Sequence, residues 1–410
     1  MSETHIDHLL IGGGVAAASC AEALREQGAG GSIALLTREL EPPYHRPPCT
    51  KDLLRGESAR EDAYVHDAAW YADHDIDLRV RTAVRGIDTD SRTVKLQGGD
   101  ELAYGSALLA TGSLVNRLRV DGSDLDGLHY VRALGNAESI RDDAEHADRV
   151  VVIGGSYIGC EVAASLTQMG KKVTVVMQEE EPMEGGFGPS VGRWIRGLLE
   201  GHGIEFLGGR QLDRFEGDGR VQLVVTGSGD ELDADLVVLG TGVKPDVMLA
   251  KAAGLSLGES GGVECDARLQ TSAPDLYAAG DICEYDSTVH GRRIRVEHEA
   301  VAEAQGAHVA AAMLGSQEPY TEVPYFWTDL ADWGSLEYVG PAAQWGEEIV
   351  RGSMDDGEFS VLYLDGDRLV ACTSSGRGDD LEAATKIIAA GGGLPADRTA
   401  LADVGRPLTD

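Results

Sequence analysis

The sequence predicts an α/β fold with two parallel-sheet units and a C-terminal α+β domain. Residues 5–37 and 148–178 each contain an apolar strand, a glycine-rich turn, a helix and a second apolar strand, which is the order of a Rossmann-like unit. From about residue 323 the pattern changes to short alternating strands followed by a helix. A chain of 410 residues has room for two or three such domains.

The first unit contains a turn suited to a dinucleotide. We expect a strand at 5–12, a helix at 17–28 and a strand at 32–37. Gly12, Gly14 and Ala17 between them fit the pattern G-x-G-x-x-A. In this pattern the first glycine permits a tight turn, the second lets a pyrophosphate approach the backbone, and the small third residue lets the helix pack on the strand. A tight turn without a ligand is the alternative.

The second unit repeats this arrangement with one departure. Gly154 and Gly159 hold the first and third places, but Ser156 occupies the middle place. Serine takes little space, and its hydroxyl is able to donate to a phosphate oxygen. We therefore expect a second dinucleotide site here.

A partial duplication supports the two-unit interpretation. Residues 94–113 predict a hairpin followed by a short buried strand, and residues 220–242 repeat that order. In the C-terminal part, residues 359–374 predict two strands joined by a turn at Asp365-Gly366. A helix at 380–391 and a short helix with a tail after 395 complete the prediction.

Composition and charge exclude several classes of function. The formal net charge of -34 opposes binding to nucleic acid or to an anionic membrane. No apolar run reaches the roughly 18 residues of a membrane span, and the first strand comes too early for a signal segment. The six cysteines show no C-x-x-C pair and no metal-ligand spacing, so we expect no metal site and a cytoplasmic location.

A third motif extends the pattern to a family resemblance. Residues 271–285 contain an apolar strand ending in Ala279-Gly280-Asp281. With the two turns and the segment LLATGS, this resembles the flavoproteins with two dinucleotide-binding domains. The resemblance implies that the first unit binds FAD, that the second binds NAD(H), and that Asp281 bonds the ribityl and phosphate region of FAD.

Four further segments narrow the resemblance. Residues 42–54, 131–134, 291–306 and 325–330 are similar to the ferredoxin reductase group, which includes putidaredoxin reductase and dioxygenase ferredoxin reductases, and to the apoptosis-inducing factor-like proteins. The implied domains are the first part of the FAD-binding domain at 1–112, an NAD(H)-binding domain at 113–243, the second part of the FAD-binding domain at 244–322, and the C-terminal α+β domain at 323–410.

The resemblance assigns FAD contacts by position. Arg38 stands where the family often has an acidic residue, so Glu39 is the better candidate for the adenosine ribose. A solvated basic turn is the alternative for Arg46 and Lys51. The implied contacts are Gly12, Gly13, Gly14, Val15, Ala16, Arg38, Glu39, Arg46, Lys51, Ala83, Arg132, Asp281, Glu297, His298 and Trp327.

The resemblance also assigns a nicotinamide site and a catalytic pair. Lys51 and Glu161 are expected to pair beside the flavin N5, with helix capping as the alternative for Glu161. Glu179 is expected to accept hydrogen bonds from a ribose diol and, as a carboxylate, to repel a 2′-phosphate; a solvated acidic turn is the alternative. No arginine is expected near it to receive a 2′-phosphate, so NADH is expected to be preferred over NADPH. The NAD(H) contacts are Gly154, Ser156, Tyr157, Ile158, Glu179 and Gly242.

The function that this resemblance implies is that of an NADH-dependent ferredoxin reductase. Electrons would pass from NADH through FAD to a [2Fe-2S] ferredoxin that serves a cytochrome P450 or a dioxygenase. The alternatives are an NADH oxidase or a quinone- or radical-reducing flavoprotein, and an NAD(H) redox sensor similar to apoptosis-inducing factor. The oligomeric state is left open, with a homodimer as one alternative.

Two further expectations concern single residues of this chain. A cluster of Arg38, Arg46, Arg292, Arg293 and Arg295 is expected to attract the ferredoxin despite the net charge of -34. Cys49 is interpreted as a small buried side chain, with a peroxide-reducing thiol as the alternative.

Overall fold

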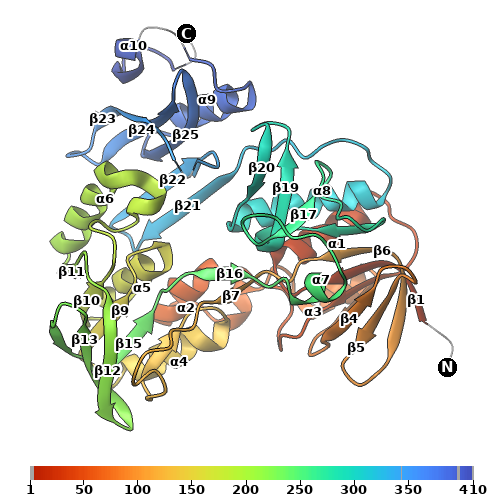
Figure 1. Cartoon of the computed structure of the whole chain (residues 1–410), viewed down its shortest axis with the longest axis horizontal. Coiled ribbons are helices and arrows are strands. Elements are labelled where there is room, and N and C mark those ends of the chain that lie inside the picture. Colours follow the sequence, from red (N-terminus) through yellow and green to blue (C-terminus); the bar gives the residue numbers. More distant parts are fainter. Residues whose placement is uncertain (1–3, 343, 395–397, 409–410) are drawn as a thin grey trace.

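The computed structural model describes residues 4–342, 344–394 and 398–408. Two parallel-sheet units lie at opposite ends of the lower part of the molecule, and the C-terminal sheet stands above the second unit (Figure 1). The chain crosses between the two units through β7 (Ser113–Val115) and β16 (Val243–Pro245), which pair with each other as antiparallel strands.

The first sheet has the order β3-β2-β1-β6-β5-β4, and β18 also pairs with β6. Strands β3, β2, β1, β6 and β18 run parallel, whereas β5 and β4 are antiparallel additions. The strands are β1 (Thr4–Ile11), β2 (Ile33–Leu36), β3 (Ile76–Arg79), β4 (Val84–Asp88), β5 (Thr93–Leu96), β6 (Glu101–Leu109) and β18 (Leu276–Ala278).

Two long helices pack against each other beside this sheet. They are α1 (Val15–Glu26) and α8 (Glu299–Met313). At Gly306 a Cβ atom would lie 2.1 Å from the carbonyl oxygen of Ala16, so only glycine permits this approach of the two backbones. This packing fixes α1, and with it the turn that precedes α1, on the sheet.

The second sheet has the order β11-β10-β9-β15-β8, and all of its strands are parallel. They are β8 (Leu128–Tyr130), β9 (Arg149–Ile153), β10 (Lys172–Val176), β11 (Glu205–Leu207) and β15 (Leu236–Leu239). The helices of this unit are α4 (Leu134–Ala144), α5 (Tyr157–Gln168) and α6 (Glu184–Gly201). A separate antiparallel sheet contains β12 (Leu212–Asp218), β13 (Arg220–Thr226) and β14 (Glu231–Asp233).

The C-terminal domain is an antiparallel sheet with the order β21-β22-β25-β24-β23, and α9 contacts β25 and β22. Its elements are β21 (Tyr325–Leu330), β22 (Gly334–Val339), β23 (Glu347–Ser353), β24 (Glu358–Asp365), β25 (Arg368–Ser375), α9 (Gly378–Ala389) and α10 (Arg398–Ala402). Residues 395–397 of the predicted tail lie outside the described part of the chain.

The remaining elements are short. A third small sheet has the order β17-β19-β20, formed by β17 (Val263–Cys265), β19 (Cys283–Ser287) and β20 (Arg292–Arg295). The short helices are α2 (Asp52–Arg55), α3 (Ala68–Asp73) and α7 (Met248–Ala252), and the 3₁₀ turns are η1 (Pro47–Thr50), η2 (Arg60–Ala63) and η3 (Gly280–Ile282).

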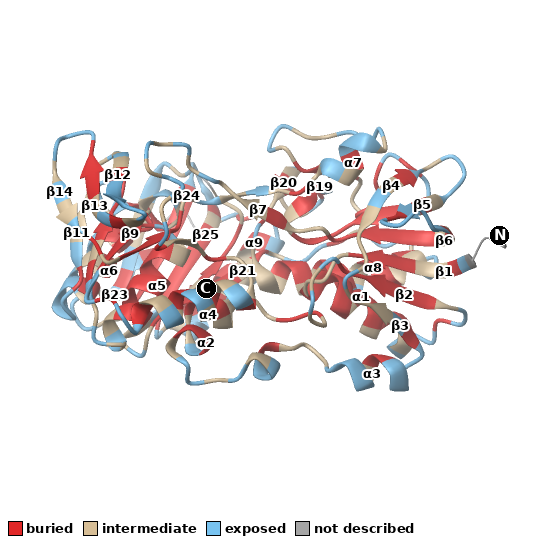
Figure 2. Ribbon diagram, turned by 90° about the horizontal axis from the view of Figure 1, so that it is seen from below, coloured by how far each residue is buried: buried red, intermediate tan, exposed pale blue. Residues whose placement is uncertain are grey.

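Burial follows the sequence pattern. Buried residues run along the strands of both parallel sheets (Figure 2), where Leu9, Leu10 and Val152 are fully inaccessible to solvent. This burial on both faces explains why these strands are continuous apolar runs rather than alternating ones. Among the described residues, no helix combines the length and the apolar character needed to cross a membrane.

The predicted α/β fold is confirmed, with one difference between its two halves. The hairpin strand and the buried strand expected within residues 94–113 form one continuous strand, β6, because β6 pairs with both β5 and β1. In residues 220–242 they remain separate as β14 and β15, since the hairpin belongs to another sheet. The predicted turn is present, with Asp365 paired to Arg368 and Gly366 at φ +57°.

Candidate active site

The first glycine-rich turn joins β1 to α1 and opens toward a cavity. A Cβ atom at Gly12 would lie 2.0 Å from the Ala110 carbonyl oxygen, and one at Gly13 would lie 2.1 Å from Thr37 Oγ1. At Gly14 the added atom would meet nothing within 4 Å. Gly14 is also the N-cap of α1 and provides no side-chain cap, so the first amides of the helix remain available to an anion.

The second turn, between β9 and α5, repeats this packing. A Cβ atom at Gly154 would lie 2.3 Å from the Gly240 carbonyl oxygen, and one at Gly159 would lie 1.9 Å from the carbonyl oxygen of Gly154. Ser156 has a φ of -81°, which any residue adopts, and this explains why glycine is not required there. Its hydroxyl donates to the Gly240 carbonyl at 3.4 Å, which is a weak bond.

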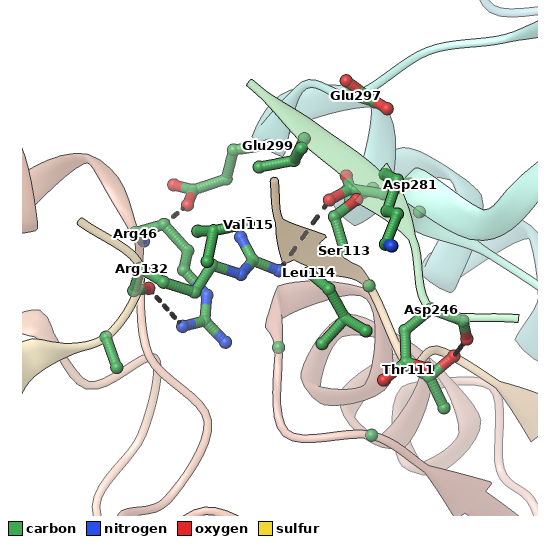
Figure 3. A pocket seen from close by; sticks show the side chains of 18 of the residues that line it. Arg46, Thr111, Ser113, Leu114, Val115, Arg132, Asp246, Asp281, Glu297 and Glu299 are labelled. Carbon is green, nitrogen blue, oxygen red and sulfur yellow. Dashed lines mark hydrogen bonds and ion pairs between the residues drawn. The ribbon is translucent and has the colours of Figure 1, made fainter. Parts of the chain in front are cut away.

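Both turns reach one large cavity of ≈ 1830 Å³. Figure 3 shows part of its lining, including Arg46, Arg132 and Asp281. Its wall also includes β21 and β22 of the C-terminal domain through Phe326, Trp327 and Tyr338. Of the predicted site residues, two do not line it: Gly154, which packs under the turn, and Glu179. Those that line it are Gly12, Gly13, Gly14, Val15, Ala16, Arg38, Glu39, Arg46, Lys51, Ala83, Arg132, Ser156, Tyr157, Ile158, Glu161, Gly242, Asp281, Glu297, His298 and Trp327.

Arg46 organises one wall of the cavity. Its guanidinium contacts Glu39 at 2.6 Å and donates to the Arg132 carbonyl oxygen at 2.7 Å (Figure 3). Tyr44 donates its hydroxyl to Glu39 at 2.6 Å. Burial alone would raise the pKa of Glu39, but Arg46 and Tyr44 outweigh it and lower that pKa. Glu39 is thus an ionised acceptor, as its predicted ribose contact requires.

Arg132 is the cation best placed for an anionic ligand. Burial and the nearby Arg46 lower its pKa, and its nearest carboxylate, Asp281, lies 3.9 Å away. Its guanidinium also lies at Gly112, where an added Cβ atom would be 3.0 Å from Nη2. A mostly buried guanidinium with a loose counter-ion, lining the same cavity as the open amides of α1, belongs to a donor set that fits a pyrophosphate.

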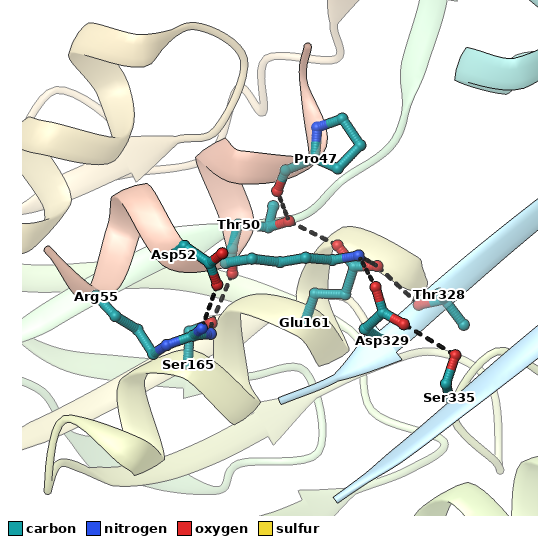
Figure 4. A network of polar contacts seen from close by, with 10 residues as sticks. Pro47, Thr50, Asp52, Arg55, Glu161, Ser165, Thr328, Asp329 and Ser335 are labelled. Carbon is teal, nitrogen blue, oxygen red and sulfur yellow. Dashed lines mark hydrogen bonds and ion pairs between the residues drawn. The ribbon is translucent and has the colours of Figure 1, made fainter. Parts of the chain in front are cut away.

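Lys51 and Glu161 meet, as predicted, but a third charged residue lies closer. Lys51 Nζ is 3.6 Å from Glu161 Oε1 and 2.6 Å from Asp329 Oδ2 (Figure 4). Glu161 is buried on α5 and has two hydroxyl partners, Thr50 at 2.6 Å and Thr328 at 2.8 Å. Burial raises the pKa of Glu161. The helix-capping alternative is not what the structure shows, because this side chain points away from the α5 backbone amides toward Thr50 and Thr328.

Glu179 lies at the carboxyl end of β10 and is exposed. The sequence places no arginine beside it, but the fold does: Arg196 donates to the Glu180 carbonyl oxygen, and Arg210 donates its backbone N–H to the Met177 carbonyl oxygen. This part of the prediction was wrong, because both residues come from later elements that pack at the end of β10. Each guanidinium already contacts a carboxylate, Glu181 for Arg196 and Asp230 for Arg210.

The predicted arginine cluster is largely neutralised within the protein. Arg38 contacts Asp246 at 3.2 Å, Arg293 contacts Asp286 at 3.0 Å, and Arg295 pairs with Glu297. Arg292 is exposed, and the described residues offer its guanidinium a carbonyl acceptor, Pro341 at 3.2 Å, but no carboxylate within ion-pair distance. Arg292 therefore carries the uncompensated charge of this group.

Cys49 is a buried thiol beside the cavity. It is 2% exposed, and burial raises its pKa to about 12. A reactive thiol requires the thiolate, which this environment disfavours. The structure therefore favours the interpretation of Cys49 as a small packed side chain.

Several residues that complete the site were not among those predicted from the sequence. Three of them contact the Lys51–Glu161 pair: Asp329, Thr50 and Thr328. Tyr44 donates to Glu39, and Glu299 accepts from the Arg46 backbone N–H. Thr50 adjoins Lys51, and Thr328 and Asp329 follow Trp327 directly. Their position beside predicted site residues was the available signal.

Comparison with known proteins identifies the family. Residues 6–308 match the family described as pyridine nucleotide-disulphide oxidoreductase, and residues 325–410 match the family described as reductase C-terminal. The chain belongs to the pyridine nucleotide-disulphide oxidoreductase family. For this family, the predicted cofactors FAD and NAD(H) are confirmed, and so is the resemblance to ferredoxin reductases.

Individual relatives of this pyridine nucleotide-disulphide oxidoreductase match over nearly their whole length. The ferredoxin–NAD(+) reductase component of the anthranilate 1,2-dioxygenase system of Burkholderia cepacia is 37% identical over 390 residues, which cover 93% of this chain and 94% of that protein. The rubredoxin-NAD(+) reductase of Pseudomonas putida is 33% identical over 366 residues, 88% of this chain and 94% of that protein. Among solved structures, the covalent putidaredoxin reductase–putidaredoxin complex gives a TM-score of 0.93 at 32% identity, covering 99% of this chain and 98% of that chain.

Proposed function

We propose that this protein is an NADH-dependent flavoprotein that reduces a [2Fe-2S] ferredoxin, which in turn serves an oxygenase such as a cytochrome P450 or a dioxygenase. The observation that supports this most strongly is the single cavity that joins both nucleotide turns to β21 and β22. A two-electron donor and a flavin need such a shared space, because their reacting rings must come into contact. The similarity to ferredoxin–NAD(+) reductase components supports the choice of acceptor.

The residues divide between two nucleotides. FAD, when bound, accepts a hydride and releases electrons one at a time. The open amides of α1 and the Arg132 guanidinium would bind its pyrophosphate, and Glu39 its ribose. Ser156, Tyr157, Ile158 and Gly242 would bind NAD(H). This division supports domains at 1–112, 113–243, 244–322 and 323–410, since residues 4–109 and 276–278 share one sheet and residues 128–239 supply another.

NADH is the proposed nucleotide rather than NADPH. Glu179 is exposed at the carboxyl end of β10, where a carboxylate accepts bonds from a ribose diol and repels a 2′-phosphate. The two arginines that the fold brings to this end are held by Glu181 and Asp230. Neither is a free cation for a 2′-phosphate.

Location in the cytoplasm is also proposed. All six cysteines are free and buried, which is typical of proteins that fold in a reducing compartment.

Steady-state turnover with NADH and a panel of acceptors tests the function. We expect saturable reduction of a [2Fe-2S] ferredoxin at a rate well above that with oxygen or a quinone. Rapid turnover with oxygen or quinone alone would instead support the oxidase alternative. A reduced flavin that persists with every acceptor would support the redox sensor. The panel should include a rubredoxin, because one relative is named a rubredoxin-NAD(+) reductase.

A further inference from the structure

Lys51 lies at unequal distances from two carboxylates, those of Glu161 and Asp329, which are labelled in Figure 4. Its ammonium lies 2.6 Å from Asp329 Oδ2, a hydrogen-bonded ion pair, and 3.6 Å from Glu161 Oε1, beyond hydrogen-bond distance. Asp329 belongs to β21 of the C-terminal domain, and Glu161 belongs to α5 of the second unit. The counter-ion of Lys51 is thus supplied by the C-terminal domain.

The hydroxyl of Thr50 has more acceptors than protons. Thr50 Oγ1 lies 2.6 Å from Glu161 Oε2 and 3.0 Å from the Pro47 carbonyl oxygen. A threonine hydroxyl has one proton, so it cannot donate to both. All contacts are satisfied together if Glu161 Oε2 carries a proton and donates to Thr50 Oγ1, while Thr50 donates to Pro47. Glu161 Oε1 then accepts from Thr328 Oγ1 at 2.8 Å.

We propose that Asp329 is the counter-ion of Lys51 and that Glu161 is a neutral carboxylic acid in the resting protein, with its proton directed through Thr50 toward Pro47. Asp329 is a positioning residue in this account, because it holds the Lys51 ammonium in the cavity wall. The inference deepens the proposed function, since Lys51 and Glu161 both line the cavity that would hold the flavin.

The charges around Glu161 support its neutral form. The charged groups that face it are Lys51, between η1 and α2, and Asp329 on β21; the neighbouring Cys160 is a buried thiol on the same helix. With Glu161 neutral, the three groups have no net charge. With both carboxylates ionised, the cluster would carry one uncompensated negative charge; Asp329 is partly exposed, so the cost would fall on the buried Glu161. Burial also raises the pKa of Glu161, which favours the same neutral form.

The neutral form has a consequence for the cavity. With Glu161 neutral, the part of the cavity wall formed by Lys51, Glu161 and Asp329 has no net negative charge and does not repel an electron pair transferred into the cavity. An ionised Glu161 would repel that electron pair. The sequence expectation of a simple Lys51–Glu161 ion pair is therefore replaced by a Lys51–Asp329 pair beside an acid.

Infrared spectroscopy of the FAD-loaded protein tests the proposal directly. Labelling the glutamate carboxyl carbons with ¹³C separates a glutamic acid carbonyl stretch from those of the flavin. We expect one such band at neutral pH in the wild type and its loss in Glu161→Gln. The band should also be lost in Asp329→Asn, because Glu161 would then be the remaining counter-ion of Lys51 and would ionise. Asp332→Asn is the matched control. Asp332 lies three residues after Asp329 and accepts a hydrogen bond from Gln168 rather than from Lys51, so the band should persist in this variant.

The flavin midpoint potential gives a second readout. Glu161→Gln exchanges one neutral group for another and should leave the potential unchanged. A rise in the potential would mean that a negative charge had been removed and would overturn the proposal. Absence of the band in the wild type, or its persistence in Asp329→Asn, would overturn it as well. If Asp329→Asn fails to retain FAD, Thr50→Val serves instead: the band should shift because the acid proton loses its acceptor. None of these results depends on the electron acceptor, so they are separate from a failure of the ferredoxin assignment.

Discussion

Replacing Gly159 with alanine tests the packing of the second turn. The added Cβ atom would lie 1.9 Å from the Gly154 carbonyl oxygen, about 1.5 Å closer than an ordinary van der Waals contact. The neighbour is backbone, so α5 or the turn must shift. Such overpacking costs about 1–3 kcal/mol. A change of about 1.4 kcal/mol corresponds to a factor of ten in a binding constant. If the whole cost of about 1–3 kcal/mol is expressed at the nucleotide site, the affinity for NADH falls roughly 5- to 150-fold.

The assay compares three quantities: FAD content from absorbance, Tm from thermal unfolding, and the KM for NADH with a dye as acceptor. Gly159→Ala should lower the Tm and raise the KM while FAD content is retained. The control is Gly197→Ala on α6, where the added atom meets nothing within 4 Å. Alanine there should stabilise the helix by about 0.5–1 kcal/mol and leave the KM unchanged. An unchanged Tm and KM in Gly159→Ala would refute the reasoning.

Three further changes have expected outcomes. Glu179→Ala should narrow the preference for NADH over NADPH in kcat/KM, and equal efficiencies already in the wild type would contradict the assignment. Cys49→Ser should leave NADH-dependent dye reduction nearly intact, whereas loss of a peroxidase activity would show a redox role. Burial lowers the pKa of His290 to about 4, so between pH 6.5 and 4 the unfolded chain binds the proton that the folded chain does not. Stability should fall with decreasing pH in this window, by at most about 1.4 kcal/mol per pH unit from this residue, and His290→Asn should show a shallower fall in chemical denaturation; parallel curves would contradict this.

Local patterns predicted the two β-α-β units well, because the features that define them lie within about 30 residues of each other. The predicted helix at 17–28 corresponds to α1 (Val15–Glu26), which begins and ends two residues earlier, and the predicted strand at 5–12 corresponds to β1 (Thr4–Ile11). Gly12 and Gly154 were recognisable because each packs closely against a backbone carbonyl group, which only glycine permits, and each therefore begins a glycine pattern of fixed spacing.

Features that depend on how distant segments pack were not predictable in this way. Asp329 reaches Lys51 across 278 positions, and Thr328 reaches Glu161 across 167. Arg196 arrives at the end of β10 through a helix whose placement the sequence pattern does not specify. The neutralisation of Arg293 by Asp286 follows from the pairing of β19 with β20, which no composition argument reveals.

The most direct test of the proposed function is a single-turnover measurement. The protein is reduced with NADH in the absence of oxygen and mixed with an oxidised [2Fe-2S] ferredoxin in a stopped-flow instrument. We expect ferredoxin reduction that saturates with ferredoxin concentration and that Arg292→Glu slows severalfold, because Arg292 is the uncompensated cation of its group. Arg292 contacts Pro341, which lines the cavity. Arg193→Glu makes the same change of charge at an exposed position of α6 that neither lines the cavity nor, within the described part of the chain, forms a hydrogen bond or ion pair with a residue that does, and it should have no such effect. Reduction no faster than that of a free dye, with both variants indistinguishable from the wild type, would contradict the account.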